Sequence, residues 1–390
     1  MIPYGQHTIG NLDAIRVAWQ VRFHTLTQGK QIAMFEEEIS NFVGARFAVA
    51  VSSATAGLHI AMMALNLPKG ARVVTTPISF VATANAVSYC GLDPVFVDID
   101  PDSLTLDLEA AKQKISDDAE VRAVITVHYA GLPDDAGKLK QLRNSTGIRV
   151  IEDAAHSFGA RYTTGDLVGS CKNSDMTVFS FHPVKSFTTG EGGVVTTNDE
   201  ELYRTLLRLR SHGINKLETR LMNPLAGETD GQMNPWYYEM IDLGFNYRLT
   251  EIQAVLGRSQ LSRIESFIVA RRKIAIHYTE ELKNFQNVSV AQRVDTSTSA
   301  HHLFPVRISF DRIDQSRRDV MMKLKGLGIG TQVHYIPIPF HPYYAQKGHP
   351  LVGLPHAVAY YEEALSIPIF PNLRKSKQKK VLHALERVVG

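Results

Sequence analysis

The chain has little cysteine, no long hydrophobic run and no strong excess of charge of one sign. Its two cysteines, Cys90 and Cys171, stand at no metal-ligand spacing in 390 residues, which excludes a disulfide scaffold and fits a reducing compartment. No apolar run approaches the length that spans a membrane, and the N-terminus lacks a basic region followed by an apolar core. We therefore expect a water-soluble, cytoplasmic protein without a membrane partner or a metal site.

The charge pattern also bears on partners. The formal net charge is only +3, and the basic residues are spread out except in residues 374–380. That run opens a C-terminal helical pattern, where a solvated helix face is commoner than a nucleic-acid surface. The charge distribution therefore argues against a nucleic-acid partner.

A chain of 390 residues is longer than one hydrophobic core usually serves, so we expect two domains. Helical patterns separate most of the strand-like segments in the first half, as at residues 57–65, 106–115 and 139–143. Such alternation predicts a largely parallel sheet with helices on both faces, whose ligands bind at the carboxyl ends of the strands. The strand-like segments are residues 47–51, 73–76, 94–97, 123–127, 150–153, 176–181 and 194–197.

The pattern changes after about Gly193. Residues 215–240 are rich in Gly, Pro, Asn and Trp and predict a long loop. We predict a large domain of residues 1–250 and a smaller α/β domain of residues 251–390. The elements expected beyond Gly193 are a helix at 201–210, one long helix from Thr250 to about Phe285, a strand at 302–308, a helix at 317–327 and a strand at 331–336.

Lys185 is the most informative residue. It follows the apolar strand at 176–181 and precedes a glycine-rich turn, so its amine lies at the end of a strand. A desolvated lysine in such a place acts as a nucleophile and forms Schiff bases. A lone lysine there is more often a surface residue in a turn, so this interpretation depends on the residues around it.

The segment Ser52–Gly57 can supply an anion site. It follows a strand and opens a helix, and its small residues leave backbone N–H groups and hydroxyls free for a phosphate. The alternative is that Ser52 or Ser53 only caps the helix. Two hydroxyls, a further one at Thr55 and the position at a strand's carboxyl end favour the anion.

Asp153 ends the strand at 150–153 and can supply the third component. A carboxylate at the end of an apolar strand needs a cation or a donor, and a protonated pyridine nitrogen would serve. Glu152 alternates to the other face of the strand. His156 is either a ligand of a ring or a satisfied structural group.

A lysine, a carboxylate and an anion site together form a pyridoxal-phosphate constellation. The carboxylate keeps the pyridine nitrogen protonated, so that electrons from the broken Cα–H bond of an amino donor can flow into the ring. Lys185, once released from its Schiff base, is free to shuttle the proton.

Five motifs, in this order and spacing, resemble the DegT/DnrJ/EryC1/StrS sugar aminotransferases over essentially the whole chain. The resemblance implies pyridoxal 5'-phosphate as cofactor and the aspartate-aminotransferase fold (fold type I), in which a large, mixed, mostly parallel sheet domain precedes a smaller C-terminal α/β domain. It also implies a homodimer with active sites at the subunit interface. The motifs are Ser-Ala-Thr at 53–55, Thr-Pro-Ile-Ser-Phe at 76–80, Glu-Asp-Ala-Ala-His at 152–156, Ser-Phe-His-Pro-Val-Lys at 180–185 and Gly-Phe-Asn-Tyr-Arg at 244–248.

Residue by residue, the resemblance implies that Lys185 is the catalytic, Schiff-base lysine and Asp153 the partner of the ring nitrogen. His156, where many members carry glutamine, would contact the phenolic oxygen. Phe80 would stack on the ring, although from the residues alone its neighbours Ile78 and Val81 suggest a core position. The implied phosphate contacts are Ala54, Thr55, Ser180 and, from the neighbouring subunit, Asn246.

Closer motifs resemble the branch of the family that acts in pseudaminic acid biosynthesis. They lie at residues 26–30, 75–85, 181–193, 210–213 and 332–335. This implies transfer of an amino group, from glutamate, to carbon 4 of a UDP-linked 4-keto-6-deoxy-N-acetyl-hexosamine of the L-altro type. The implied substrate site is Tyr4, His24, Thr25, Leu26, Thr27, His334 and Tyr335. From the residues alone, Tyr4 is a chain terminus and His334 and Tyr335 belong to a strand.

Other functions remain open at this point. A close alternative is a transaminase for another nucleotide-linked keto sugar, of the UDP-bacillosamine or GDP-perosamine type. A sugar dehydratase with the same cofactor would carry histidine at position 185. A non-catalytic regulatory or binding protein on the same fold would have no use for Lys185, Asp153 and Ser180 together.

Overall fold

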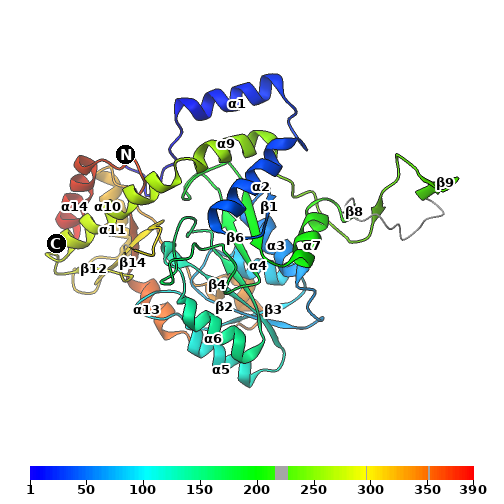
Figure 1. The fold of residues 1–390 in the computed structure, drawn as a ribbon. Helices are drawn as coiled ribbons and strands as arrows, with labels where there is room; N and C mark the ends of the chain where they lie inside the picture. The colour runs from blue at the N-terminus through cyan, green and yellow to red at the C-terminus, as the bar shows by residue number, and fades with distance from the viewer. Residues whose placement is uncertain (216–226, 296, 350–351) are drawn as a thin grey trace.

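The structure is a computed structural model that describes residues 1–215, 227–295, 297–349 and 352–390. Its largest sheet has seven strands in the order β1-β7-β6-β5-β4-β2-β3 (Figure 1). The strands from β2 to β6 run parallel to one another, whereas β7 is antiparallel to both β6 and β1. The large, mixed and mostly parallel sheet is therefore confirmed. Its strands are β1 (Phe47–Val51), β2 (Arg72–Thr75), β3 (Asp93–Phe96), β4 (Val121–Val127), β5 (Arg149–Asp153), β6 (Met176–Ser180) and β7 (Gly193–Thr197).

Helices cover both faces of this sheet because its strands are apolar on both sides. On β1, Val49 and Val51 pack with α3, α4 and α7, and the alternate residues Ala48 and Ala50 pack with α2 and α9. Farther along the sheet, α5 and α6 cover the second face. These helices are α2 (Lys30–Val43), α3 (Ala54–Ala64), α4 (Ala82–Tyr89), α5 (Leu108–Asp117), α6 (Ala136–Thr146), α7 (Glu200–Arg210) and α9 (Glu251–Leu261).

Three of these helices begin at an aspartate. The carboxylates of Asp107, Asp135 and Asp199 accept backbone N–H groups in the first turns of α5, α6 and α7. Each carboxylate satisfies amides that have no acceptor within the helix. Local capping therefore sets where the connections end and the helices start.

The second half of the chain surrounds a smaller, three-stranded antiparallel sheet in the order β12-β13-β14. Its core also contains Ile2, and the carbonyl of Tyr4 accepts the amide of Ile369, so the N-terminal segment lies against this smaller unit. The division of the chain at residue 250 stays a prediction. The elements here are α10 (Ile264–Leu282), β12 (Val288–Val290), β13 (Phe304–Ile308), α11 (Arg317–Gly326), α13 (Pro355–Glu363), β14 (Ala364–Ile367) and α14 (Lys375–Val389).

The predicted long helix from Thr250 to Phe285 is two helices. α9 ends at Leu261 and α10 begins at Ile264, with Ser262 and Arg263 between them. Arg263 pairs with Asp13 of the N-terminal helix α1 (Asn11–Phe23), which packs on α9. The apolar spacing runs through the break because both helices bury a face in the same core, so the pattern alone did not reveal it.

The strand predicted at 331–336 is also absent. Only Gln332 makes a bridge, to Ser366 of β14. Two residues farther on, the carbonyl of His334 is taken by the hydroxyls of Tyr129 and Tyr360, at 2.5 and 2.9 Å. Side-chain hydroxyls therefore bind the His334 carbonyl, which in a strand would accept a backbone amide of a neighbouring strand.

The predicted loop at 215–240 lies partly outside the described residues, at 216–226. Its described part extends away from the body of the molecule (Figure 1) and contains two short antiparallel pairs, β9 with β10 and β11 with β8. These strands are β8 (Ile214–Asn215), β9 (Glu228–Thr229), β10 (Gln232–Met233) and β11 (Glu239–Met240). The remaining short elements are η1 (Tyr129–Gly131), η2 (Ile338–Phe340) and α12 (Pro342–Gln346).

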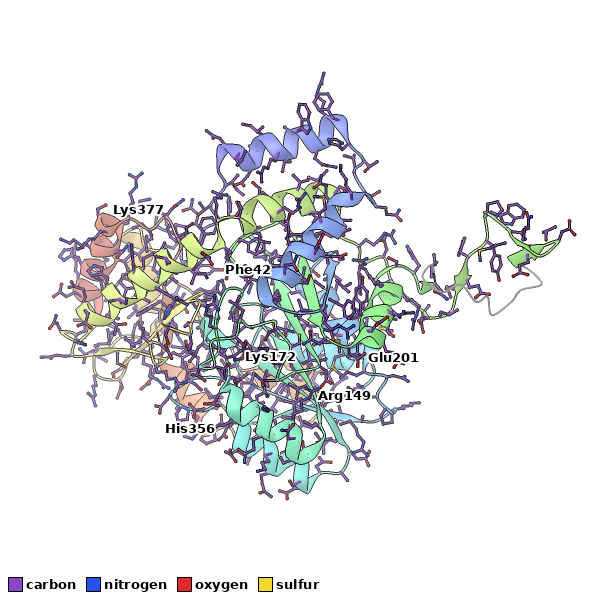
Figure 2. All side chains as sticks on the ribbon, viewed as in Figure 1. Phe42, Arg149, Lys172, Glu201, His356 and Lys377 are labelled. Carbon is purple, nitrogen blue, oxygen red and sulfur yellow. The ribbon has the colours of Figure 1, made fainter. Side chains whose placement is uncertain are left out.

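Charged side chains such as Arg149, Glu201 and Lys377 lie at the periphery of the molecule (Figure 2). Lys377 belongs to the basic run 374–380 and is exposed on α14. Within the described ranges, none of the helices has the length and apolar character needed to cross a membrane.

Candidate active site

A cavity of about 620 Å³ lies where β5 and β6 end and α3 begins. Ligands of open α/β sheets bind at this edge. The residues around it come from the large sheet, from the N-terminal segment and from the segment after α11. The predicted site residues that line it are Tyr4, Ala54, Thr55, Phe80, Asp153, His156, Ser180, Lys185, His334 and Tyr335.

Lys185 reaches this cavity from the turn that follows β6. Within the turn, the amide of Lys185 donates to the carbonyl of His182 and the hydroxyl of Thr188 donates to the carbonyl of Phe181, each over 2.9 Å. The side chain is half-buried, and burial lowers the pKa of its amine to about 8 against the opposing attraction of Asp153. More neutral, nucleophilic amine is therefore present at neutral pH than for an exposed lysine.

Asp153 ends β5 with its carboxylate buried in the cavity wall. Oδ2 accepts the hydroxyl of Thr83 over 2.7 Å, and Oδ1 accepts the amide of Ala155 over 3.2 Å. Burial raises the pKa of this carboxyl, and the two hydrogen bonds lower it. Glu152 points to the other face of the strand, where separate donors bind it. Asp153 is thus the β5 carboxylate that can meet a cationic ring nitrogen.

The start of α3 forms the anion-binding side of the cavity. The hydroxyl oxygen of Ser53 accepts the amide of Ala56 over 3.1 Å, so Ser53 does cap the helix. The amides of Ala54 and Thr55, at the first two helical positions, have no acceptor within the helix. Together with the helix dipole and the nearby hydroxyl of Ser180, they suit a phosphate group.

Gly193 lets this helix start approach the sheet. It pairs with Val51 of β1 and with Ser180 of β6, beside the cavity. A Cβ at this position would lie 2.7 Å from the amide nitrogen of Ala54 and 2.8 Å from the carbonyl oxygen of Phe179. Only glycine permits this approach of two backbones.

The opposite wall is built from aromatic and imidazole rings. The hydroxyl of Tyr335 lies 3.1 Å from Nε2 of His156, and Nδ1 of His334 lies 2.9 Å from the hydroxyl of Ser366. The ring of Tyr4 packs on that of His334 with centroids 5.3 Å apart. Burial holds the pKa of His156 well below its ordinary value, so its imidazole is neutral. Tyr4 is therefore not a free terminus, and Tyr335 is not part of a strand.

Phe80 lies at the edge of the cavity. Its side chain is 58% exposed, whereas Ile78 is fully buried, so the core position suggested by its neighbours is wrong. Its ring centroid lies 6.2 Å from that of Tyr335, which lines the same cavity. Phe80 can therefore pack on a ligand.

Five predicted residues do not line this cavity: His24, Thr25, Leu26, Thr27 and Asn246. All are exposed. The carbonyl of Leu26 accepts the amide of Glu251, at the start of α9, with a distance of 3.0 Å, and Asn246 lies four residues before the N-cap residue of that helix, Thr250. Their place leaves them available to another molecule rather than to their own cavity.

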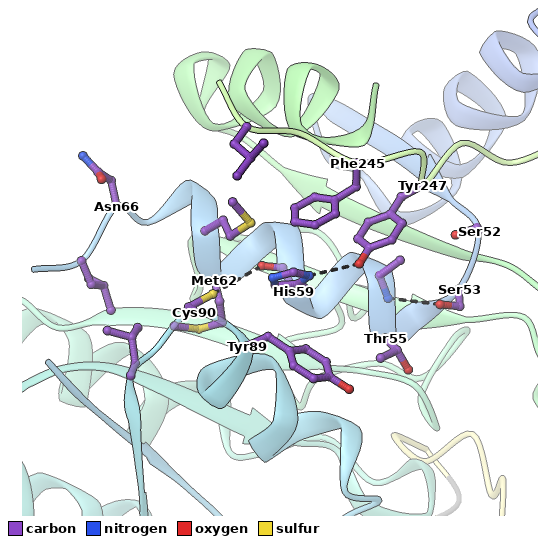
Figure 3. A pocket seen from close by; sticks show the side chains of 15 residues that line it. Ser52, Ser53, Thr55, His59, Met62, Asn66, Tyr89, Cys90, Phe245 and Tyr247 are labelled. Atoms are coloured by element: carbon purple, nitrogen blue, oxygen red, sulfur yellow. Dashed lines mark hydrogen bonds between the residues drawn. The ribbon is translucent and has the colours of Figure 1, made fainter. Parts of the chain in front are cut away.

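A second cavity, of about 730 Å³, adjoins the first at the start of α3 (Figure 3). Ser53 and Thr55 line both. In its wall Nδ1 of His59 lies 3.2 Å from the hydroxyl of Tyr247, whose ring stacks on Phe245 at 4.8 Å. Sequence reasoning did not single out this cavity, because its apolar residues fit ordinary core positions.

The residues present fit pyridoxal phosphate. One cavity holds an amine with a lowered pKa, a buried carboxylate and two helix amides without an acceptor in the helix. Nδ1 of His156 is buried and has no hydrogen-bond partner among the described residues, which leaves it for a ligand. Such an arrangement can bind a phosphorylated, cationic ring and move a proton beside it.

Comparison with known proteins agrees with this chemistry. Residues 8–386 match the DegT/DnrJ/EryC1/StrS aminotransferase family. The spore coat polysaccharide biosynthesis protein SpsC of Bacillus subtilis is 32% identical over 390 residues, which cover 100% of this chain and 97% of SpsC. Two solved structures superpose over the whole chain. PseC of Helicobacter pylori, an aminotransferase of pseudaminic acid biosynthesis, has a TM-score of 0.89 and 28% identity and is covered to 99%. Spr1654 of Streptococcus pneumoniae, in its PLP form, has a TM-score of 0.87 and 25% identity and is covered to 98%.

Proposed function

Because the chain belongs to the DegT/DnrJ/EryC1/StrS aminotransferase family, we propose that it transfers an amino group to carbon 4 of a UDP-linked 4-keto-6-deoxy-N-acetyl-hexosamine of the L-altro type. The chain is a sugar aminotransferase, and its cofactor is pyridoxal phosphate. The amino donor in this proposal is glutamate. The product is the 4-amino sugar of a pseudaminic acid route.

The observation that carries the proposal is the meeting of Lys185, Asp153 and the start of α3 in one cavity. When bound, pyridoxal phosphate carries the amino group and takes up the electrons of the broken Cα–H bond. Nζ of Lys185 would hold the cofactor and, once released, would take the proton from the Cα atom of the amino donor and return it at the second carbon of the transfer. The carboxylate of Asp153 would accept the N–H of the ring and keep the positive charge of the ring in place.

The phosphate group is assigned to the amides of Ala54 and Thr55 and the hydroxyl of Ser180. Phe80 and His156 would hold the ring from its face and its edge. Beyond the ring, Tyr335 and His334 leave an aromatic and imidazole wall, which suits the apolar and hydroxylated faces of a sugar.

A second copy of the chain completes the site in this proposal. Some of the proposed substrate and phosphate contacts do not line the cavity. These are residues 24–27 and Asn246, which are exposed. Gln253 of α9 donates to the carbonyl of Glu191, which lines the cavity, so α9 starts beside the site. A two-fold dimer would let each copy offer those exposed residues to the other.

The likeness to PseC over the whole chain supports the choice of sugar. The test is a transamination assay with glutamate against UDP-4-keto sugars of the L-altro and D-gluco types and a GDP-linked 4-keto sugar. We expect turnover of the L-altro type at least tenfold above the others, since discrimination by one hydrogen-bonded group reaches this order. Equal or greater turnover of another sugar would overturn the substrate assignment, and a Lys185→Ala protein supplies the blank.

A further inference from the structure

Asp153 accepts from the first of two linked hydroxyl groups, whose residues lie within the sequence motifs but received no role there. The hydroxyl of Thr83, on α4, donates to Oδ2 of Asp153 over 2.7 Å. The hydroxyl of Ser79 lies 2.7 Å from that of Thr83. Thr83 is fully buried and Ser79 nearly so, and Ser79 also lines the cavity. A chain of two hydroxyls therefore leads from the cavity wall to the carboxylate.

The charge of Asp153 fixes the direction of this chain. A hydroxyl carries one proton, and an ionised carboxylate carries none. Thr83 therefore gives its proton to Asp153, and Ser79 must give its own to Thr83. Donors aligned in this way strengthen one another in a buried site.

The groups around Asp153 show how strongly the ionisation of its carboxyl depends on Thr83. Burial raises the pKa of the carboxyl, and the Thr83 hydroxyl is the strongest influence that lowers it. The amide of Ala155 and the positive charges of Lys185 and His128 also lower this pKa, each more weakly than Thr83. Tyr335, the other titratable group facing it, has a pKa that burial raises, so it is uncharged and offers no compensation.

We propose that Thr83 and Ser79 are positioning residues, which keep Asp153 ionised and hold its carboxylate toward the ring nitrogen of the cofactor. The inference rests on the assignment of Asp153 in the proposed function. It adds that the electronic state of the bound cofactor depends on a hydroxyl chain outside the predicted site. Neither hydroxyl touches the reacting atoms.

The test compares Thr83→Val, which removes the hydroxyl at nearly constant shape, with Thr83→Ser, which keeps it. Thr75→Val is the matched control: Thr75 is also fully buried, and its hydroxyl donates to the carbonyl of Ile125 over 2.9 Å, away from the cavity. The measurements are the dissociation constant of pyridoxal phosphate, the pH titration of its visible band, and kcat and KM.

We expect Thr83→Val to weaken cofactor binding and lower kcat by about 10- to 100-fold, the range for loss of one hydrogen bond to a charged group, with little change in KM. The titration of the visible band should shift, because Asp153 then takes up a proton more easily. Thr83→Ser should keep a cofactor affinity and a kcat within about threefold of the wild type. The losses in Ser79→Ala should lie between those of Thr83→Ser and Thr83→Val. Thr75→Val should change only the melting temperature.

Double variants separate positioning from a general loss of structure. In an Asp153→Asn background only a neutral amide acceptor remains, so Thr83→Val should have a much smaller effect on the visible band and on kcat than it has in the wild type. Additive effects, or a Thr83→Val protein with wild-type titration and kcat, would overturn the proposal. If Thr83→Val does not fold, Ser79→Ala decides by the same measurements. Binding and the spectral titration need no sugar, so they remain informative even if the proposed substrate fails.

Discussion

The hydroxyl of Tyr335 lies 3.1 Å from Nε2 of His156, which links the segment after α11 to the loop after β5. Burial raises the pKa of the Tyr335 hydroxyl above its ordinary value, so this hydroxyl keeps its proton and is able to donate it to Nε2 when that nitrogen is unprotonated. A neutral imidazole that accepts at Nε2 carries its own proton at Nδ1. That N–H is buried and has no protein partner among the described residues. With Nε2 accepting from Tyr335, His156 can donate from Nδ1 to a ligand, which in the proposed function is the phenolic oxygen of the cofactor.

Replacing Tyr335 tests this arrangement. Tyr335→Phe removes the donor and frees the second tautomer of His156, so we expect cofactor binding to weaken by about 5- to 10-fold, the value of one neutral hydrogen bond. His156→Gln in the same protein should recover part of the loss, because an amide can donate without help from Tyr335. Fluorescence titration of the apoprotein with pyridoxal phosphate measures both. Tyr343→Phe, at an exposed tyrosine, is the control.

The rate at which the apoprotein captures pyridoxal phosphate should follow the neutral amine of Lys185. Its pKa is lowered to about 8 by burial, so capture should rise with pH and level off above a midpoint near 8. Stopped-flow absorbance between pH 6 and 10 measures this rate. Lys185→Ala should show no capture and no visible band. Lys172→Ala, at a surface lysine paired with Asp166, should behave as the wild type, and a midpoint above 10 would refute the activated amine.

Much of this site was predictable because its signals are local. Lys185, Asp153 and the segment after Val51 each follow an apolar strand, and strand ends can be read from short runs of sequence. Thr83 and Tyr335 gave no such signal. Thr83 bonds to a residue 70 positions away, and Tyr335 lies in a segment that reads as a strand until the hydroxyls of Tyr129 and Tyr360 bind the preceding carbonyl.

The fold shows the same division. The strands of the large sheet were predicted within a few residues because both faces are buried and apolar. The break between Leu261 and Ile264 was missed, because both helices bury a face in the same core and the apolar spacing runs through the break. Contacts that are distant in sequence decided the details that local patterns left out.

Gly193→Ala should damage the phosphate site. Its Cβ would lie 2.7 Å from the amide nitrogen of Ala54, so the start of α3 has to move away from Ser180. We expect cofactor affinity to fall by more than about tenfold, since two backbone donors to a phosphate are displaced. Gly326→Ala is the control, because a Cβ there meets nothing within 4 Å. Equilibrium dialysis with pyridoxal phosphate compares the two, and equal affinities would contradict the assigned phosphate site.

Glu152 should matter for stability rather than for the cofactor. Its buried carboxylate accepts hydrogen bonds from Tyr162, Ser174 and Thr177 and lies 3.5 Å from Nε2 of His128. Glu152→Leu removes the charged acceptor of these donors and one of the two carboxylates beside His128, so we expect the free energy of unfolding at pH 7 to fall by about 3–5 kcal/mol. Urea unfolding measures it, with Glu280→Leu, at an exposed pair with Lys283, as a control.

The pH dependence of that difference follows from the sign of the shift. His128 and the hydroxyl donors hold the pKa of Glu152 below its ordinary value of 4.5, although burial opposes them. The stabilisation by the carboxylate is therefore fully present above pH 4.5 and is lost as the pH falls through the lowered pKa. The difference between the wild type and Glu152→Leu should become smaller below that point. A constant difference down to pH 3 would show that the charge of Glu152 contributes nothing.

The shared site can be tested by combining two defective copies. Asn246→Ala should weaken phosphate binding in the neighbouring copy, and Lys185→Ala should inactivate the copy that carries it. In a hybrid dimer one site then has both residues and the other has neither. Random exchange makes half of the dimers hybrids, so the mixture should reach about one quarter of wild-type activity at limiting cofactor.

Each variant alone supplies the baseline, since Lys185→Ala is inactive and Asn246→Ala loses its cofactor at the same concentration. If Asn246 acts within its own chain, the only copies with a lysine still lack the asparagine, and mixing gains nothing. The comparison therefore depends on which copy carries each residue, whatever sugar the enzyme prefers. It can be read from the visible band of retained cofactor as well as from turnover, because a hybrid site with Lys185 and Asn246 both present should hold pyridoxal phosphate through dialysis.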